Sequence, residues 1–86
     1  MKEQRIEAID GNSWISGVID RLLLHDGSAC IVDFKTDHAD SPEQLRKRHS
    51  NQLNAYARIV SRITGIPPER IACIIVSTHL KETIRI

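Results

Sequence analysis

A two-residue turn signal, Asp26-Gly27, separates two apolar runs that are rich in Leu, Ile and Val. Asp-Gly between such runs favours a tight β-hairpin, because a type I′ turn needs two residues that tolerate positive φ. A turn of this length also sets which residues of the two strands face each other. Counting outward from the turn, Asp20 faces Asp33. The turn therefore predicts a hairpin of defined register in the first half of the chain.

This register places two acidic residues and a lysine on one face of the hairpin. Directly opposed residues have Cβ atoms about 4.5–5.5 Å apart, so we expect the carboxylates of Asp20 and Asp33 to be neighbours. Lys35 follows two residues after Asp33 and shares its face. Because the flanking residues are apolar, opposed carboxylates would destabilise the sheet, and Lys35 can compensate only one of them. A divalent cation such as Mg²⁺ would remove this conflict.

Two simpler interpretations of the same residues stay open. On an exposed sheet face, both carboxylates would be hydrated, and Lys35 would only form an ion pair with one of them. A β-bulge in either strand would shift the register and separate Asp20 from Asp33. The apolar neighbours favour a metal site over an exposed face, and the sequence alone does not decide whether a bulge is present.

The sequence also predicts one long helix. Ser41 with Gln44 forms a capping box, Pro42 fits the first helical position, and Gly65 followed by Pro67-Pro68 ends the helix. The strand-like segments are Gln4–Ile9, Trp14–Leu24, Ala29–Lys35, Arg70–Ser77 and Glu82–Ile86. The order β-β-β-α-β-β predicts an α/β domain in which a mixed five-stranded sheet packs against one long helix.

The core of this domain must be aliphatic, because Trp14, Phe34 and Tyr56 are the only aromatic residues among 86. With 41% hydrophobic and 27% charged residues, the composition is that of a globular protein. We expect Trp14 to pack in the core or on the first hairpin. The shortage of aromatic side chains also disfavours a protein that binds nucleic acid mainly by stacking.

Several classes of protein are disfavoured by what the sequence contains. No apolar run approaches 18 residues, so we expect no membrane span, and no leader for secretion is recognisable. Cys30 and Cys73 lie in apolar strands without the spacing of metal ligands, which favours buried, reduced thiols in a cytoplasmic protein. The absence of a C-x-x-C motif argues against an iron–sulfur cluster.

Charge is distributed unevenly along the chain. Residues 1–41 carry eight acidic and four basic side chains, whereas residues 42–62 carry one acidic and five basic side chains. An acidic half beside a basic helix suggests a cation site next to a surface that binds a polyanion. A solvated helix surface is the simpler explanation. The run Arg46-Lys47-Arg48 covers almost a full helical turn, so its three side chains cannot all face one way.

Three segments, in this order, resemble the RecB-type nuclease domain of the PD-(D/E)XK superfamily, which lies at the C-terminus of bacterial helicase–nucleases that process DNA double-strand breaks. They are Gly17–Arg21 (GVIDR), Ile31–Thr36 (IVDFKT) and Gln52–Ala57 (QLNAYA). The resemblance extends from about residue 5 to the end of the chain. It implies a restriction-endonuclease-like core.

The resemblance also implies roles for individual residues. Asp20 and Asp33 correspond to metal ligands, and the backbone carbonyl of Phe34 usually completes the set that the protein supplies. Lys35 corresponds to the catalytic lysine, which orients or deprotonates the attacking water and stabilises charge on the phosphate. The expected metal is Mg²⁺, with Mn²⁺ as an alternative.

Residues of the predicted helix correspond to the part of the family's fold that supports the site and contacts DNA. Gln52 and Tyr56 match the family's helix pair, and they are four residues apart, so they share one helix face. The neighbouring basic residues are expected to hold phosphates by contacts that do not depend on DNA sequence. These basic residues are Arg46, Lys47 and Arg48.

One feature of the family has no counterpart here. The family normally has a helix before its first strand, and this helix carries a His or Glu that also binds the metal. Residues 1–86 therefore resemble a single nuclease core without its first helix, and Glu7, the nearest upstream acid, lies on a strand. The surface that such a helix would cover is expected to be exposed and to promote self-association.

The predicted function is that of a Mg²⁺-dependent deoxyribonuclease, the C-terminal exonuclease part of an ATP-dependent helicase–nuclease in double-strand-break repair. Its expected partners are DNA and either the parent helicase region or a partner protein of the helicase–nuclease. Two alternatives stay open. The chain could be a catalytically incomplete module that binds DNA or protein, or a small structural domain whose motifs are coincidental.

Overall fold

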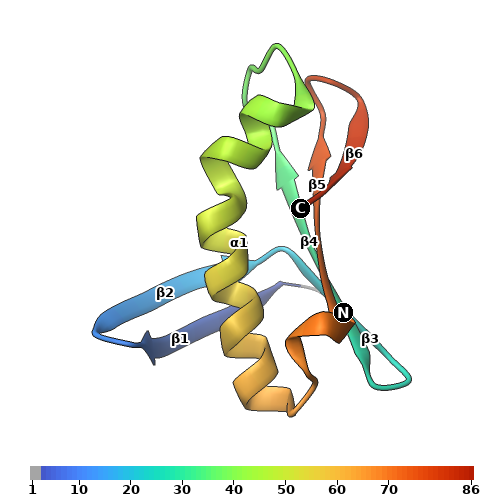
Figure 1. The fold of residues 1–86 in the computed structure, drawn as a ribbon. Helices are drawn as coiled ribbons and strands as arrows, with labels where there is room; N and C mark the ends of the chain where they lie inside the picture. The colour runs from blue at the N-terminus through green and yellow to red at the C-terminus, as the bar shows by residue number, and fades with distance from the viewer. Residues whose placement is uncertain (1–2) are drawn as a thin grey trace.

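The computed structural model describes residues 3–86. The described strands form an antiparallel hairpin, β1–β2, and a four-stranded sheet of order β3-β4-β5-β6 (Figure 1). In the larger sheet, β4 and β5 are parallel and the other two pairs are antiparallel. The predicted α/β fold, with a mixed sheet and one long helix, is confirmed. The elements are β1 (Gln4–Asp10), β2 (Ser13–Ile19), β3 (Arg21–His25), β4 (Ser28–Lys35), α1 (Pro42–Thr64), the 3-10 helix η1 (Pro68–Arg70), β5 (Ile71–Ser77) and β6 (Glu82–Arg85).

The predicted strand Trp14–Leu24 is two strands in the structure, because the chain bends at Asp20. β2 ends at Ile19 and pairs with β1, whereas β3 starts at Arg21 and pairs with β4. The Asp20 carboxylate accepts a hydrogen bond from the Phe34 N–H at 2.9 Å, so its side chain takes the place of a backbone partner for β4. The prediction of a single five-stranded sheet is corrected accordingly.

The Asp26-Gly27 turn has the predicted geometry. Both residues have positive φ, 46° and 73°. β3 and β4 keep the register that this turn predicts as far as Arg21 opposite Val32, where the ladder of backbone hydrogen bonds ends. Asp20 is therefore not a ladder partner of Asp33, although the bend still brings it beside β4.

Helix α1 spans the predicted residues, Pro42–Thr64. Gly65 caps its C-terminus with a left-handed φ of 78° and donates its N–H to a carbonyl one turn back at 2.9 Å. The N-terminus departs from the predicted capping box. The Ser41 side chain makes no capping hydrogen bond, and the Gln44 N–H donates instead to the Ser41 carbonyl at 3.2 Å. The Gln44 side chain reaches one residue further back than predicted, where its Oε1 accepts the Asp40 N–H at 2.9 Å. Among the helices of the described residues, none has the length and hydrophobicity needed to cross a membrane.

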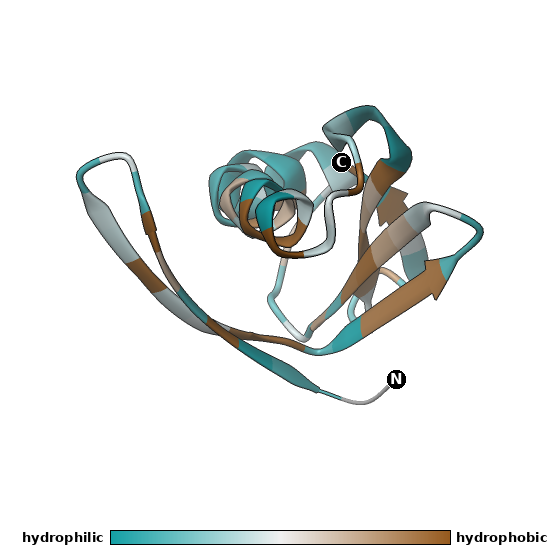
Figure 2. Ribbon diagram, turned by 90° about the horizontal axis from the view of Figure 1, so that it is seen from below, coloured by the Kyte–Doolittle hydropathy of each residue, from teal (hydrophilic) through white to brown (hydrophobic). Residues whose placement is uncertain are grey.

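The core lies between α1 and one face of the four-stranded sheet. Figure 2 shows the helix on one side of this sheet. On the opposite face, which no helix of the described residues covers, Leu23 and Phe34 are 47% and 48% exposed. The self-association expected of such a surface stays a prediction. The most deeply buried side chains are those of Ile19, Ile31, Leu45, Leu53, Ile59, Ile75 and Ser77.

The β1–β2 hairpin extends beyond the sheet as a curved arm (Figure 2). Charged groups hold its tip to α1: Arg58 Nη2 donates to Asp10 Oδ2 at 2.7 Å, and Arg62 Nη1 donates to the Ile9 carbonyl at 2.8 Å. Trp14 lies close to this tip, opposite Ile9, and is 63% exposed. Of the two positions predicted for Trp14, the hairpin is therefore the observed one and the core is not.

Candidate active site

Asp20, Asp33 and Lys35 lie together where β3 begins and β4 ends. Asp33 faces the helix and is buried, with 9% of its surface exposed. Lys35 Nζ lies 3.1 Å from Asp33 Oδ2, and its side chain is 22% exposed. The hydrogen bond from the Phe34 N–H holds the Asp20 carboxylate beside the same stretch of β4. The structure thus brings together the three residues that the sequence grouped, through a bend rather than through a continuous ladder.

The electrostatics of this group reflect its burial. Burial raises the pKa of the Asp33 carboxyl above its ordinary value, and the neighbouring Asp20 carboxyl raises it further, whereas Lys35 lowers it. Burial also raises the pKa of Tyr56, and the negative charges of Asp33 and Asp20 act in the same direction. The Tyr56 hydroxyl therefore stays protonated beside the carboxylates and is available as a hydrogen-bond donor.

The position of Tyr56 depends on Gly17. A Cβ atom added to Gly17 would overlap the Tyr56 hydroxyl, so a residue with a side chain at position 17 would have to displace the ring. Tyr56 is buried on α1 and Gly17 lies on β2, three residues before Asp20. The glycine of the GVIDR segment and the tyrosine of the QLNAYA segment are therefore one packing unit, which sets the distance between helix and hairpin beside the carboxylates.

The residues of this site fit a hydrated divalent cation. Two carboxylates share a poorly solvated region and one lysine compensates only part of their charge, which is the conflict that a cation relieves. No cluster of three or more His, Cys, Asp or Glu side chains suitable for a metal occurs within residues 3–86. Glu7 does not join the site, because it is exposed on β1 and lies 3.9 Å from Arg5. Mg²⁺ commonly binds one or two carboxylates and keeps several waters, so Asp20 and Asp33 match its preference.

The three basic residues of the first helical turns face different ways. Arg46 Nε donates to the Arg85 carbonyl at 3.0 Å, and Arg48 Nη1 donates to the His38 carbonyl at 2.8 Å. Lys47 is exposed and forms no ion pair with any residue that the structure describes. Two of the three side chains therefore brace α1 against neighbouring segments while they lie at the surface.

An Asp–His pair beside the site was not predicted from the sequence. His49 Nε2 lies 2.8 Å from Asp37 Oδ2, and this contact lowers the pKa of Asp37. The His38 and His79 rings also meet, with centroids 4.4 Å apart. No local pattern links Asp37 to His49, because the two residues lie on a loop and a helix 12 positions apart. The pair ties α1 to the loop that follows Lys35.

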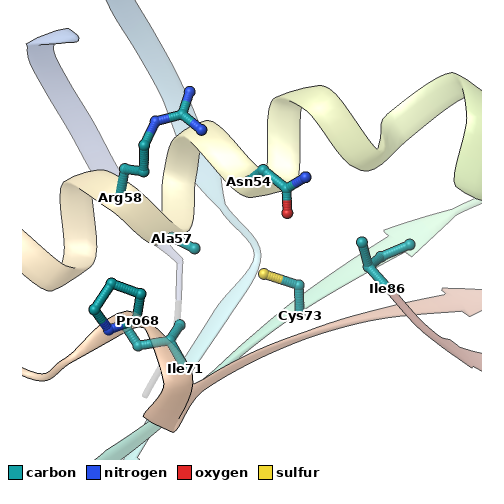
Figure 3. Close-up of a pocket in the computed structure, with 7 residues that line it drawn as sticks. All are labelled: Asn54, Ala57, Arg58, Pro68, Ile71, Cys73 and Ile86. Carbon is teal, nitrogen blue, oxygen red and sulfur yellow. The ribbon is translucent and has the colours of Figure 1, made fainter.

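A cavity of about 310 Å³ lies between α1, η1 and β5 (Figure 3), and Asp20, Asp33 and Lys35 do not line it. Its Cys73 thiol donates to the Leu53 carbonyl with a sulfur–oxygen distance of 3.6 Å. Burial raises the pKa of this thiol to about 11, so it stays protonated and unreactive. Cys30 is half-buried, and both cysteines are free, as the sequence predicts. The residues that line the cavity are Asn54, Ala57, Arg58, Pro68, Ile71, Cys73 and Ile86.

A carboxylate at a bend, a second one on β4, a lysine two residues after it and a buried helix tyrosine are the pattern of a class of protein, the nucleases built on a PD-(D/E)XK core. Residues 2–84 match the family model of the PD-(D/E)XK nuclease superfamily, and the chain belongs to this superfamily. The family that the three sequence segments resemble is thereby confirmed.

Curated proteins similar to this chain include components of helicase/nucleases. The chain is similar to the A component of the ATP-dependent helicase/nuclease of Streptococcus pyogenes serotype M5 (strain Manfredo) and to that of serotype M49 (strain NZ131), with 36% identity over 53 residues in each case. The matched segment is 62% of this chain and 4% of each relative, so the chain corresponds to a small part of those proteins. No solved structure gives a significant match.

Proposed function

We propose that residues 1–86 are a single nuclease core that hydrolyses DNA phosphodiester bonds with a divalent metal ion, Mg²⁺ or alternatively Mn²⁺. The observation that carries this proposal is the buried Asp33 beside Asp20 and Lys35 in a member of a nuclease superfamily. Similarity to one component of a helicase/nuclease supports a role beside a helicase region or a partner protein, as an exonuclease in the cytoplasmic repair of double-strand breaks.

Asp20 and Asp33 are the side chains that would hold the metal, together with the backbone carbonyl of Phe34. A metal bound there supplies a Lewis acid and lowers the pKa of its water. Lys35 provides a fixed positive charge next to Asp33, where it stabilises charge on the phosphate and orients the attacking water. The protonated Tyr56 hydroxyl can donate a hydrogen bond beside the same carboxylates.

The test is cleavage of linear DNA by the full chain in Mg²⁺. Asp33→Asn and Lys35→Ala should each reduce the rate by at least about 100-fold, because each removes charge from the reacting centre. Glu69→Gln is the matched control: it neutralises an exposed carboxylate on η1 and should leave the rate unchanged. Equal rates for the wild type, Asp33→Asn and Lys35→Ala would contradict the proposal.

A second candidate is a non-catalytic module of the same fold that binds DNA. It is favoured by the presence of only two candidate carboxylate ligands, without a third metal-binding side chain beside them in residues 3–86. Calorimetric titration with Mg²⁺ and Mn²⁺ separates the two functions. Saturable binding that Asp20→Ala and Asp33→Ala abolish supports the nuclease, whereas DNA binding without metal binding or cleavage supports the module.

A further inference from the structure

Strand β1 has an edge that no other described strand occupies. It pairs with β2 on one side, and Figure 1 shows no strand of the described residues along its other side. The two-residue turn Gly11-Asn12 joins the strands, so the closing pair, Asp10 and Ser13, is hydrogen-bonded. Hydrogen-bonded positions then alternate along the strand. The even-numbered residues of β1 therefore bond to β2, whereas the odd-numbered residues turn their backbone N–H and C=O groups to the free edge.

The free edge passes Arg5 and Glu7 and is closed at Ile9. The Ile9 carbonyl accepts a hydrogen bond from Arg62 Nη1 at 2.8 Å, which agrees with odd-numbered residues facing this edge. The Arg5 carbonyl accepts only the side-chain amide of Gln4, at 3.5 Å. Beyond the strand ladder, no hydrogen bond to the Glu7 backbone occurs within residues 3–86. Unpaired backbone groups of this kind can accept a further strand.

The side chains on this edge carry opposite charges at a spacing of two. Arg5 and Glu7 flank the buried Ile6, so strand alternation turns both away from α1, and their side chains are 69% and 50% exposed. Their contact within the strand is 3.9 Å long, and an exposed pair of this kind contributes little to stability. In an antiparallel copy of β1 centred on Ile6, Arg5 stands opposite the partner's Glu7, and Glu7 stands opposite the partner's Arg5.

Only the register centred on Ile6 gives both charges of each copy an opposite charge. Centring on Arg5 opposes two arginines, and centring on Glu7 opposes two glutamates. Centring on Gln4 leaves Glu7 without a partner and engages Glu3, which lies before β1. Like charges directly opposed destabilise a sheet, and charged edge strands usually prevent association for this reason. Here the same charges exclude the other registers and permit one.

An apolar groove of about 240 Å³ opens beside this edge. The consecutive residues Gln4–Ile6 form one wall, so the groove reaches the backbone of β1, and residues of β3 and of the end of α1 form the other walls. Leu24 and Ile63 line it and are 50% and 71% exposed. The twofold axis of the paired strands is perpendicular to the sheet at Ile6, which sets the groove of one copy against the groove of the other. Covering both apolar side chains there favours association.

We propose that the free edge of β1 pairs with β1 of a second copy of this chain, antiparallel and centred on Ile6, so that the hairpins of both copies form one continuous sheet. Arg5 and the partner's Glu7 exchange backbone hydrogen bonds and form a cross-strand ion pair, and the twofold axis repeats this pairing. The interface is separate from the uncovered face of the four-stranded sheet that carries Leu23.

Sedimentation equilibrium of the full chain at several concentrations, in EDTA and without DNA, measures the association. The mass is expected to rise with concentration to twice that of one chain. Arg5→Glu and Glu7→Arg each place like charges opposite each other across the interface, so each should raise the dissociation constant at least about tenfold. Both side chains are exposed, so urea denaturation should show that each variant keeps its fold.

Mixing the two variants tests the register. Arg5→Glu carries only acidic side chains at the paired positions, and Glu7→Arg carries only basic ones. An equimolar mixture should therefore form a heterodimer with roughly the affinity of the wild type, although each variant alone dissociates. The double exchange of Arg5→Glu and Glu7→Arg in one chain should likewise restore the homodimer.

The matched control is Glu69→Arg, which makes the same change of charge as Glu7→Arg at an exposed position on η1, outside the groove. It should leave the dimer unchanged, and so should Leu23→Thr. A mass equal to one chain at every concentration overturns the proposal, as does a mixture of the two variants that fails to associate. Association that Leu23→Thr abolishes and Arg5→Glu leaves intact would also overturn it and assign the interface to the uncovered sheet face.

Discussion

The four-stranded sheet and the tip of the β1–β2 hairpin are held against the same helix by different forces. The sheet presents wholly buried aliphatic side chains such as Ile31 and Ile75 to α1. The tip of the hairpin is attached by hydrogen bonds from Arg58 to Asp10 and from Arg62 to a backbone carbonyl. Charged contacts near solvent are individually weak, whereas buried aliphatic groups dominate stability. We infer that the tip of the hairpin is attached less firmly than the sheet.

The largest expected effect on the free energy of unfolding is that of a substitution in the sheet. Ile31→Ala should lower the free energy of unfolding by about 2–5 kcal/mol, because it leaves a cavity in the core. Ile9→Ala, at an exposed position of the hairpin, should change it by less than about 0.5 kcal/mol. Urea denaturation measures both values. Similar losses for the two variants would show that the hairpin is as firmly packed as the sheet.

The next effect concerns the base of the hairpin, which is packed more tightly than its tip. Gly17→Ala should destabilise the fold by about 1–3 kcal/mol, because the new Cβ overlaps the Tyr56 hydroxyl. Tyr56→Phe removes this hydroxyl and should restore part of the stability in the double variant. A double-mutant cycle in urea measures the coupling, and purely additive losses would contradict the assigned contact.

A smaller effect depends on pH and concerns the tip. The Arg58 guanidinium beside Asp10 lowers the pKa of that carboxyl below its ordinary value of 3.8. The ionised carboxylate therefore stabilises the fold above that value, and this contribution is lost as the pH falls through the lowered pKa. Asp10→Asn should thus shift the urea midpoint at pH 6 and have no effect once the pH is well below the lowered pKa. A shift of the same size at both pH values would show that the contact is not ionic.

The smallest expected change in stability is that of Leu23→Thr, a variant that tests self-association. Leu23 lies on the face of the sheet that α1 does not cover and is 47% exposed. If that face mediates self-association, light scattering at several concentrations should show a mass that rises with concentration, and Leu23→Thr should reduce this rise. A mass equal to one chain at every concentration would reject the predicted self-association.

Much of the site could be predicted because its determinants are local. The Asp26-Gly27 turn sets the register of β3 and β4, and strand periodicity then places Lys35 on the same face as Asp33. Three motifs in order were enough to identify the superfamily. The Asp37–His49 pair could not be predicted in this way, because it joins residues of different elements and follows no sequence pattern.

The division between the two sheets could not be predicted either. The mostly apolar segment from Trp14 to Leu24 contains no turn signal and has the pattern of one strand. The bend at Asp20 comes from a hydrogen bond with a residue 14 positions away, and such a bond leaves no trace in the local hydropathy. For the same reason the pattern could not show that Trp14 belongs to a separate arm.

Local chemistry in the sequence was therefore sufficient for the turn, the limits of α1, the α/β class and the grouping of Asp20, Asp33 and Lys35. Turn geometry, helix stop signals and strand periodicity act over a few residues, which is why they can be read from the chain alone. The separate hairpin, the fit of Tyr56 against Gly17 and the exposure of Trp14 arise only when distant segments pack against each other.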